Sequence, residues 1–181
     1  MALFQMDFIS QSLKRSVPVN VLIPADPKVG YPPREEKPFK TLYLLHGLNG
    51  DHTGWLTQAN TTAYAQLYDL AIVMPSGECS FYLDHERSGL MYSQFIGSEI
   101  VDFTRRIFPL SRKREDTLIG GLSMGGFGAL YNGLRYHDVF GAIIALSSAI
   151  LVRHMETAPS GSGARGADIS FYEAVAGGGV D

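Results

Sequence analysis

The sequence predicts an α/β fold with a mostly parallel, doubly wound sheet and an antiparallel strand pair at its N-terminal end. Three observations lead to this prediction. Short continuous apolar runs recur along the chain, as in strands that are buried on both faces of a parallel sheet. Amphipathic helical patterns separate these runs, which is the order of elements in an α/β sheet. About the first forty residues instead show a period of two, which is typical of half-buried antiparallel strands.

Two β-strands are expected before residue 24. The first carries Phe4, Met6 and Phe8 at alternate positions, which predicts one buried and one exposed face. The second covers residues 17–23, where Pro18 lacks a backbone N–H and should confine the strand to a sheet edge or to a strand start. Residues 24–38 are rich in Pro, Lys and Glu and indicate an exposed loop rather than a domain linker.

Four continuous apolar runs then predict strands of a parallel sheet. They cover residues 41–45, 70–74, 117–119 and 141–146, and Pro75 stops the second of them. Such runs are expected where helices cover both faces of the sheet. We therefore expect these four strands to share a common direction, with their carboxyl ends at one edge.

Helical patterns lie between these runs. Each pattern places apolar side chains three or four residues apart, which puts them on one face of a helix. The first stripe is Ile96, Ile100, Phe103 and Ile107, and the second is Phe127, Leu130 and Leu134. From residue 147 onward the chain has no strand pattern and indicates loop or disorder, apart from a short helical pattern near residues 169–176.

Composition and charge exclude several classes of protein. Fifteen Lys and Arg against eighteen Asp and Glu give a net charge of −3, and two acidic residues directly follow the one basic cluster, residues 112–114. This balance predicts no nucleic-acid partner. Cys79 is the single cysteine, so neither an intrachain disulfide nor a thiolate metal cluster is expected. A secretion-signal pattern is missing and no apolar run reaches the roughly 20 residues of a membrane span, which predicts a cytoplasmic protein.

Residues 121–125, Gly-Leu-Ser-Met-Gly, fit the G-x-S-x-G pattern of a nucleophile elbow. In such an elbow a serine stands on a sharp turn between a strand and a helix. The motif here directly follows the expected strand 117–119 and directly precedes the second helical pattern. Gly121 and Gly125 leave room where strand and helix crowd together, and the helix N-terminus favours developing negative charge. This context favours a nucleophilic Ser123 over a serine in a structural turn.

A second turn, residues 46–50 with the sequence His-Gly-Leu-Asn-Gly, closes the expected strand 41–45 at the same edge of the sheet. An oxyanion hole needs two backbone N–H groups that point at one position. We expect one from Met124, which directly follows the nucleophile, and the other from Leu48. A simple tight turn would explain the glycines by themselves, but the neighbouring elbow favours the oxyanion hole.

With these motifs in this order, the sequence resembles the esterase D-like branch of the α/β-hydrolases. That branch includes tributyrin esterases, S-formylglutathione hydrolases, feruloyl esterases and the secreted mycolyltransferases. The resemblance runs from about residue 4 to residue 148. Leu-Ser-Met around Ser123 is most similar to the bacterial tributyrin (short-acyl) esterases, whereas S-formylglutathione hydrolases usually have a histidine at the position of Leu122. The segments that carry the resemblance are residues 44–48, Trp55, residues 73–77, residues 80–82 and residues 121–126.

The resemblance implies a serine carboxylesterase that cleaves short-chain acyl or aryl-acyl esters through an acyl-enzyme. Ser123 would be the nucleophile, and Leu48 and Met124 would supply the oxyanion donors. No metal or organic cofactor is implied, because acid–base and electrostatic effects suffice for ester cleavage. Trp55, Phe81 and Tyr82 would lie near the site, although packing explains them more simply.

A serine nucleophile also needs a histidine base and an orienting acid, which follow it in this fold in the order Ser, Asp or Glu, His. His46 and His85 precede Ser123, against the expected order. We expect His46 to be structural in its turn. His85, beside Asp84, could line the edge of the pocket, but a solvated loop explains it more simply. His137 and its neighbour Asp138 lie at the far end of the helix, roughly 20 Å away at about 1.5 Å per residue. They are excluded as direct partners.

His154 would lie at the correct edge of the sheet, but Asp168 could orient it only in the reversed chain order. The preferred hypothesis is that residues 1–148 are the N-terminal two-thirds of an α/β-hydrolase domain that lacks the last strands. Residues 149–181 would be a flexible or incomplete segment, and the catalytic acid and base would lie outside these 181 residues. The strand 141–146 would then leave an apolar sheet edge, which a second copy of the chain could cover.

Two other functions stay open at this point. One is S-formylglutathione hydrolysis on the same fold. The other belongs to a different class: a catalytically incomplete fragment, or a non-catalytic binding protein that kept the fold without the acid and base. The sequence does not determine the natural ester or the length of its acyl chain.

Overall fold

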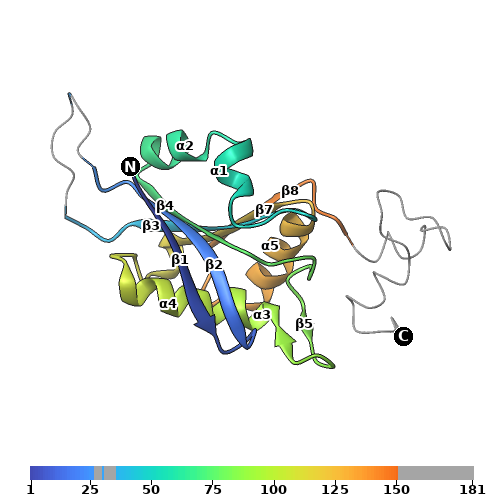
Figure 1. Ribbon diagram of the computed structural model, residues 1–181. Coiled ribbons are helices and arrows are strands. Elements are labelled where there is room, and N and C mark those ends of the chain that lie inside the picture. The colour runs from blue at the N-terminus through green and yellow to red at the C-terminus, as the bar shows by residue number, and fades with distance from the viewer. Residues whose placement is uncertain (27–29, 31–35, 151–181) are drawn as a thin grey trace.

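The computed structural model describes residues 1–26, 30 and 36–150, and its central feature is a six-stranded sheet with the order β1-β2-β4-β3-β7-β8 (Figure 1). β1 and β2 are antiparallel to each other, and β2 is antiparallel to β4, whereas β4, β3, β7 and β8 run parallel. The strands are β1 (Ala2–Ser10), β2 (Arg15–Ile23), β3 (Lys40–Leu45), β4 (Leu70–Pro75), β7 (Thr117–Leu122) and β8 (Ala142–Leu146). The predicted α/β class and the antiparallel N-terminal pair are confirmed.

Helices lie on both faces of this sheet, as the doubly wound prediction requires (Figure 1). One face carries α1 (Gly54–Gln58) and α2 (Thr61–Leu67). The other face carries a continuous helical segment made of α3 (Tyr92–Gln94), the π-helical turn η1 (Phe95–Glu99) and α4 (Ile100–Ile107), followed later by α5 (Met124–Arg135). The smaller elements are a hairpin of β5 (Asp84–His85) and β6 (Leu90–Met91) and a 3₁₀ turn, η2 (Arg114–Asp116).

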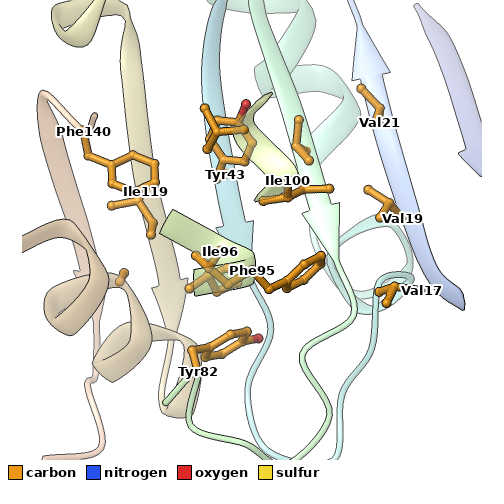
Figure 2. Packing of buried hydrophobic residues seen from close by; sticks show 14 of the residues in the cluster. Val17, Val19, Val21, Tyr43, Tyr82, Phe95, Ile96, Ile100, Ile119 and Phe140 are labelled. Atoms are coloured by element: carbon orange, nitrogen blue, oxygen red, sulfur yellow. The ribbon is translucent and has the colours of Figure 1, made fainter. Parts of the chain in front are cut away.

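The larger core fills the space between the sheet and the α3–α5 side. Figure 2 shows Tyr43 of β3 and Ile119 of β7 packed towards Ile96 and Ile100 of the helical segment. Tyr43 is fully buried, and its hydroxyl forms a 2.8 Å hydrogen bond with Thr104. Desolvation raises the pKa of this tyrosine to about 12, so it stays a neutral hydrogen-bonding group.

The position of β2 corrects one prediction. β2 is an interior strand that pairs with both β1 and β4, so the expectation that Pro18 confines it to an edge or a strand start is wrong. The pairing with β4 begins only at Val19, and the Pro18 carbonyl accepts a hydrogen bond from the Ser76 N–H just past the end of β4. Pro18 therefore faces β4 where the ladder has ended, and its missing N–H breaks no strand pairing.

The apolar stripe 96–107 is confirmed as helical, but the segment begins four residues earlier and includes the π-helical turn. Glu99, the last residue of that turn, accepts hydrogen bonds from Ser10 Oγ (2.6 Å) and from the N–H groups of Gln11 (2.6 Å) and Ser12 (3.1 Å). A carboxylate that accepts several N–H bonds is stabilised in its ionised form. Glu99 thus ties the β1–β2 turn to the helix, a contact between residues about ninety positions apart.

β8 is the last strand of the sheet among the described residues. On the face towards α1, side chains at the end of the sheet stay open to solvent: Leu122 exposes 43%, Ile144 40% and Leu146 45% of its surface. The predicted apolar edge is therefore present. No helix in the described part of the chain is long and apolar enough to cross a membrane.

Candidate active site

Ser123 occupies the turn between β7 and α5, with φ 57° and ψ −114°. A non-glycine residue in such a conformation carries strain of about 1–3 kcal/mol, which surrounding contacts must hold. The Ser123 N–H donates to the Leu146 carbonyl (2.9 Å), and its own carbonyl accepts from the N–H groups of Phe127 and Ala149 (both 3.0 Å). The end of β8 and the first turn of α5 thus hold the strained backbone, while Ser123 itself is half-buried and reachable.

The glycines on either side of Ser123 are required by close contacts between backbones. A Cβ atom on Gly125 would overlap the Leu45 carbonyl oxygen and lie 2.6 Å from the His46 carbonyl oxygen. On Gly121 it would lie 2.8 Å from the Leu45 carbonyl oxygen. The small-residue requirement predicted from the motif is confirmed, because β3, β7 and α5 meet here without room for a methyl group.

The turn 46–50 lies beside this elbow. β3 and β7 are paired in parallel with Leu45 opposite Gly121, so the residues that follow each strand emerge side by side. A Cβ atom built on Gly47 would lie 3.7 Å from Ser123 Cβ. The two predicted oxyanion donors therefore come from neighbouring elements: Leu48 from the turn, and Met124 from the first residue of α5, where the N–H has no partner within the helix.

Three side chains hold the turn 46–50 in place through hydrogen bonds to its backbone and to the end of β3. Trp55 Nε1 donates to the Leu45 carbonyl (3.0 Å), and the buried Tyr82 hydroxyl donates to the His46 carbonyl (2.9 Å). The His46 ring contacts the Gly47 carbonyl through Nδ1 (2.8 Å) and the Gly77 N–H through Nε2 (2.9 Å). Desolvation by burial is the main reason that the pKa of His46 is lowered. The expected structural role of His46 is confirmed.

The role of Tyr82 is what the sequence left unpredicted. Its ring lies between two glycines, since a Cβ on either Gly77 or Gly128 would collide with the ring. Its backbone carbonyl accepts from Asn132 Nδ2 of α5 (3.1 Å). Tyr82 therefore connects the turn 46–50 to the helix that follows Ser123. In the sequence, only Gly77 and Gly128 hint at this role of Tyr82, and neither glycine indicates that its neighbour in the fold is a tyrosine.

No histidine or carboxylate among the described residues hydrogen-bonds the Ser123 hydroxyl. His85 corrects a prediction, because it lies half-buried in strand β5 with Nε2 3.3 Å from the Ser80 carbonyl rather than in a solvated loop. His137 is exposed just beyond the far end of α5, as expected. His154 and Asp168 lie outside the described residues. The part of the chain that the structure describes also holds no group of three or more His, Cys, Asp or Glu arranged for a metal ion.

This strand–serine–helix arrangement on a parallel sheet defines an α/β-hydrolase fold, and comparisons with known proteins agree. The family model named Esterase matches residues 10–163. The acetyl esterase of Caldicellulosiruptor saccharolyticus is 42% identical over 179 residues, which cover 98% of this chain and 67% of that protein. The chain belongs to this esterase family, in its esterase D-like branch.

Solved structures show the same fold. The fluorophosphonate-binding serine hydrolase FphF of Staphylococcus aureus matches with a TM-score of 0.79 and 30% identity, over 97% of this chain and 66% of that one. The S-formylglutathione hydrolase FrmB of the same species matches with a TM-score of 0.76 and 30% identity over the same shares. A ferulic acid esterase of Anaeromyces mucronatus shares the fold at 22% identity and a TM-score of 0.66, over 89% of this chain and 61% of that one. The chain spans about two thirds of the length of the acetyl esterase and of the two Staphylococcus enzymes.

Proposed function

We propose that this chain carries the nucleophile and the oxyanion hole of a serine esterase that cleaves short-chain acyl or aryl-acyl esters. The observation that carries the proposal is the strained Ser123 backbone at the junction of β7 and α5, directly beside the turn 46–50. Strain at a non-glycine residue persists only where the fold enforces it, and here it lifts a hydroxyl to the carboxyl edge of a parallel sheet.

In this proposal Ser123 Oγ attacks the carbonyl carbon of the ester while a base takes the hydroxyl proton. The negative charge that develops on the carbonyl oxygen is received by the Leu48 and Met124 N–H groups and by the N-terminus of α5. Collapse of the tetrahedral intermediate breaks the bond to the alcohol, which leaves with the proton from the base. Water then attacks the acyl-enzyme while the base takes its proton. The bond between the acyl carbon and Ser123 Oγ breaks, the carboxylic acid is released, and the base returns the proton to Ser123.

The base and its orienting acid are proposed to lie outside the described residues. None of the four histidines in the described part of the chain hydrogen-bonds Ser123. His46 holds backbone groups, His85 lies in a hairpin and His137 lies beyond the far end of α5. His52 follows the turn 46–50; its carbonyl accepts from Asn20 Nδ2, and its buried Nδ1 has no hydrogen-bond partner. We also propose that residues 1–148 form the N-terminal two-thirds of the hydrolase domain.

S-formylglutathione hydrolysis is the second candidate, and the 30% identity to FrmB of Staphylococcus aureus favours it. The two candidates differ in the leaving group: an alcohol in the first and a thiol in the second. A comparison of p-nitrophenyl acetate with S-formylglutathione as substrates separates them.

The first experiment is steady-state hydrolysis of p-nitrophenyl acetate and butyrate by the 181-residue chain, with Ser123→Ala as the control. A fluorophosphonate probe is applied in parallel, because it reports the nucleophile without a full catalytic cycle. Turnover that is lost in the control supports the esterase. Labelling of Ser123 without turnover supports an incomplete hydrolase. Equal labelling of wild type and control contradicts the proposal and favours a non-catalytic protein on this fold.

A further inference from the structure

We infer that His46 is a positioning residue that sets the direction of the Leu48 N–H by holding the carbonyl of Gly47. This inference rests on the proposed function, since it concerns one of the two proposed oxyanion donors. In this role the His46 ring neither transfers a proton nor merely fills space: it orients a backbone donor.

The geometry of one peptide group connects the two residues. The Gly47 carbonyl and the Leu48 N–H belong to the same planar trans peptide, so they point in opposite directions and turn together. The carbonyl is held from two sides: His46 Nδ1 lies 2.8 Å from it, and the Gly50 N–H donates to it over 3.1 Å. As long as both contacts persist, the Leu48 N–H cannot rotate away from its present direction.

The hydrogen bonds around the ring determine its tautomer. The Gly77 N–H can only donate, so His46 Nε2, which lies 2.9 Å from it, must be the unprotonated acceptor. The single proton of the neutral imidazole is then on Nδ1, and it is donated to the Gly47 carbonyl. Burial favours this uncharged form, since the residue exposes only 3% of its surface.

Residues far away in the sequence hold the ring in this orientation. Gly77 lies in the loop after β4, and Tyr82 from the same loop donates its hydroxyl to the His46 carbonyl and packs its ring edge-on to the imidazole at 5.8 Å. Gly77 can approach only because it lacks a side chain, since an added Cβ would lie 2.7 Å from Tyr82 Cζ. The loop 76–82 thus fixes the orientation and the tautomer of the imidazole. The imidazole in turn fixes the orientation of the Gly47–Leu48 peptide.

A matched pair of variants separates the two ring contacts. In His46→Asn the amide nitrogen takes the place of Nδ1 and keeps a donor for the Gly47 carbonyl. In His46→Gln the amide oxygen takes the place of Nε2 and keeps an acceptor for the Gly77 N–H, but the donor to Gly47 is lost. The measured quantity is the second-order rate of fluorophosphonate labelling at Ser123 in the full chain, with His137→Gln as a control on an exposed histidine.

We expect His46→Asn to label within about threefold of wild type and His46→Gln to label at least about tenfold more slowly, since a lost oxyanion donor costs roughly 10²–10³ in rate. Where p-nitrophenyl acetate is turned over, the loss should fall on kcat and not on KM. Equal rates in the two variants at similar unfolding temperatures, or a slower Asn variant, would overturn the inference alone. A wild-type chain that labels no faster than Ser123→Ala would overturn the proposed function and the inference with it.

A measurement on the wild-type chain guards against variants that fail to fold. The ¹⁵N chemical shifts of the His46 imidazole distinguish a ring protonated at Nδ1 from one protonated at Nε2. We expect the Nδ1-protonated neutral form at pH 7, with a protected proton. A ring protonated at Nε2 would overturn the inference whatever the labelling rates are.

Discussion

The two sides of β7 differ in how completely the described chain covers them. Towards β3, backbones approach so closely that glycine is required, and hydrogen bonds hold the turn 46–50 from several directions. Towards β8, the apolar side chains of Ile144 and Leu146 stay open to solvent. Ser123 lies between the two sides: its N–H donates to the Leu146 carbonyl of β8, while Gly121 and Gly125 on either side of it pack against the Leu45 carbonyl of β3. The backbone of the nucleophile therefore depends on a finely packed region and on the least covered strand of the sheet.

The largest effect is expected from Gly125→Ala on the packed side. The new Cβ would overlap the Leu45 carbonyl oxygen, so β3 and α5 would have to separate. We expect a loss of at least about 3 kcal/mol in the free energy of unfolding, at the upper end of overpacking effects. Urea denaturation measures it. Gly54→Ala is the control, since a Cβ there meets no atom within 4 Å, and a comparable loss in the control would contradict the packing argument.

A smaller effect is expected from Tyr82→Phe, which removes only the hydroxyl that donates to the His46 carbonyl. Burial raises the pKa of Tyr82 well above its ordinary value, so the lost group is a neutral donor. Leaving a buried carbonyl without its donor costs about 1–3 kcal/mol. Thermal unfolding compared with Tyr64→Phe, a substitution on the exposed surface of α2, provides the measurement. Identical shifts in both variants would show that the turn does not need this bond.

The uncovered side is tested by Ile144→Lys. We propose that a second copy of the chain covers the β8 edge, because unpaired strand edges with apolar side chains associate readily. Lysine on the edge should reduce self-association in sedimentation velocity and should lower the free energy of unfolding by less than about 1 kcal/mol, because Ile144 is already 40% exposed. Leu67→Lys on α2 is the control. A wild-type chain that stays monomeric would contradict the proposal.

The smallest effect concerns pH. Burial lowers the pKa of His46, while Asp51 raises it and His52 lowers it further. Below about pH 6.5, His46 is therefore protonated more fully in the unfolded chain than in the folded chain. The free energy of unfolding should fall as the pH drops below that value. Hydrogen bonds from the Thr53 hydroxyl and N–H hold the pKa of Asp51 below its ordinary value. The stability that Asp51 contributes is therefore lost only in more acid solution.

Urea denaturation between pH 5 and pH 8 measures this dependence. The free energy of unfolding should rise with pH up to about 6.5 in the wild-type chain and should rise less steeply in His46→Asn. Equal slopes in the two proteins would show that His46 does not bind protons differently in the folded and unfolded states.

Much of the site's framework was predictable because it follows from local backbone requirements. G-x-S-x-G between a strand and a helix indicates an elbow whatever the rest of the chain does, and continuous apolar runs indicate buried parallel strands. The environments of Pro18 and His85 were predicted wrongly for a common reason. Neither environment leaves a periodic signal: Pro18 depends on Ser76, far along the chain, and His85 lies in a hairpin whose two strands have only two residues each.

By itself the sequence determined the fold class, the esterase resemblance and the two turns that meet at the carboxyl edge of the sheet. These properties are encoded in neighbouring residues, where steric limits on the backbone and the spacing of apolar side chains act over a few positions. Only the tertiary structure decided which way the Leu48 peptide faces. That direction depends on the tautomer of His46, which is chosen by the Gly77 N–H thirty-one residues away. A hydrogen bond between distant segments exists only after the chain has folded, so no local pattern of residues could have specified it.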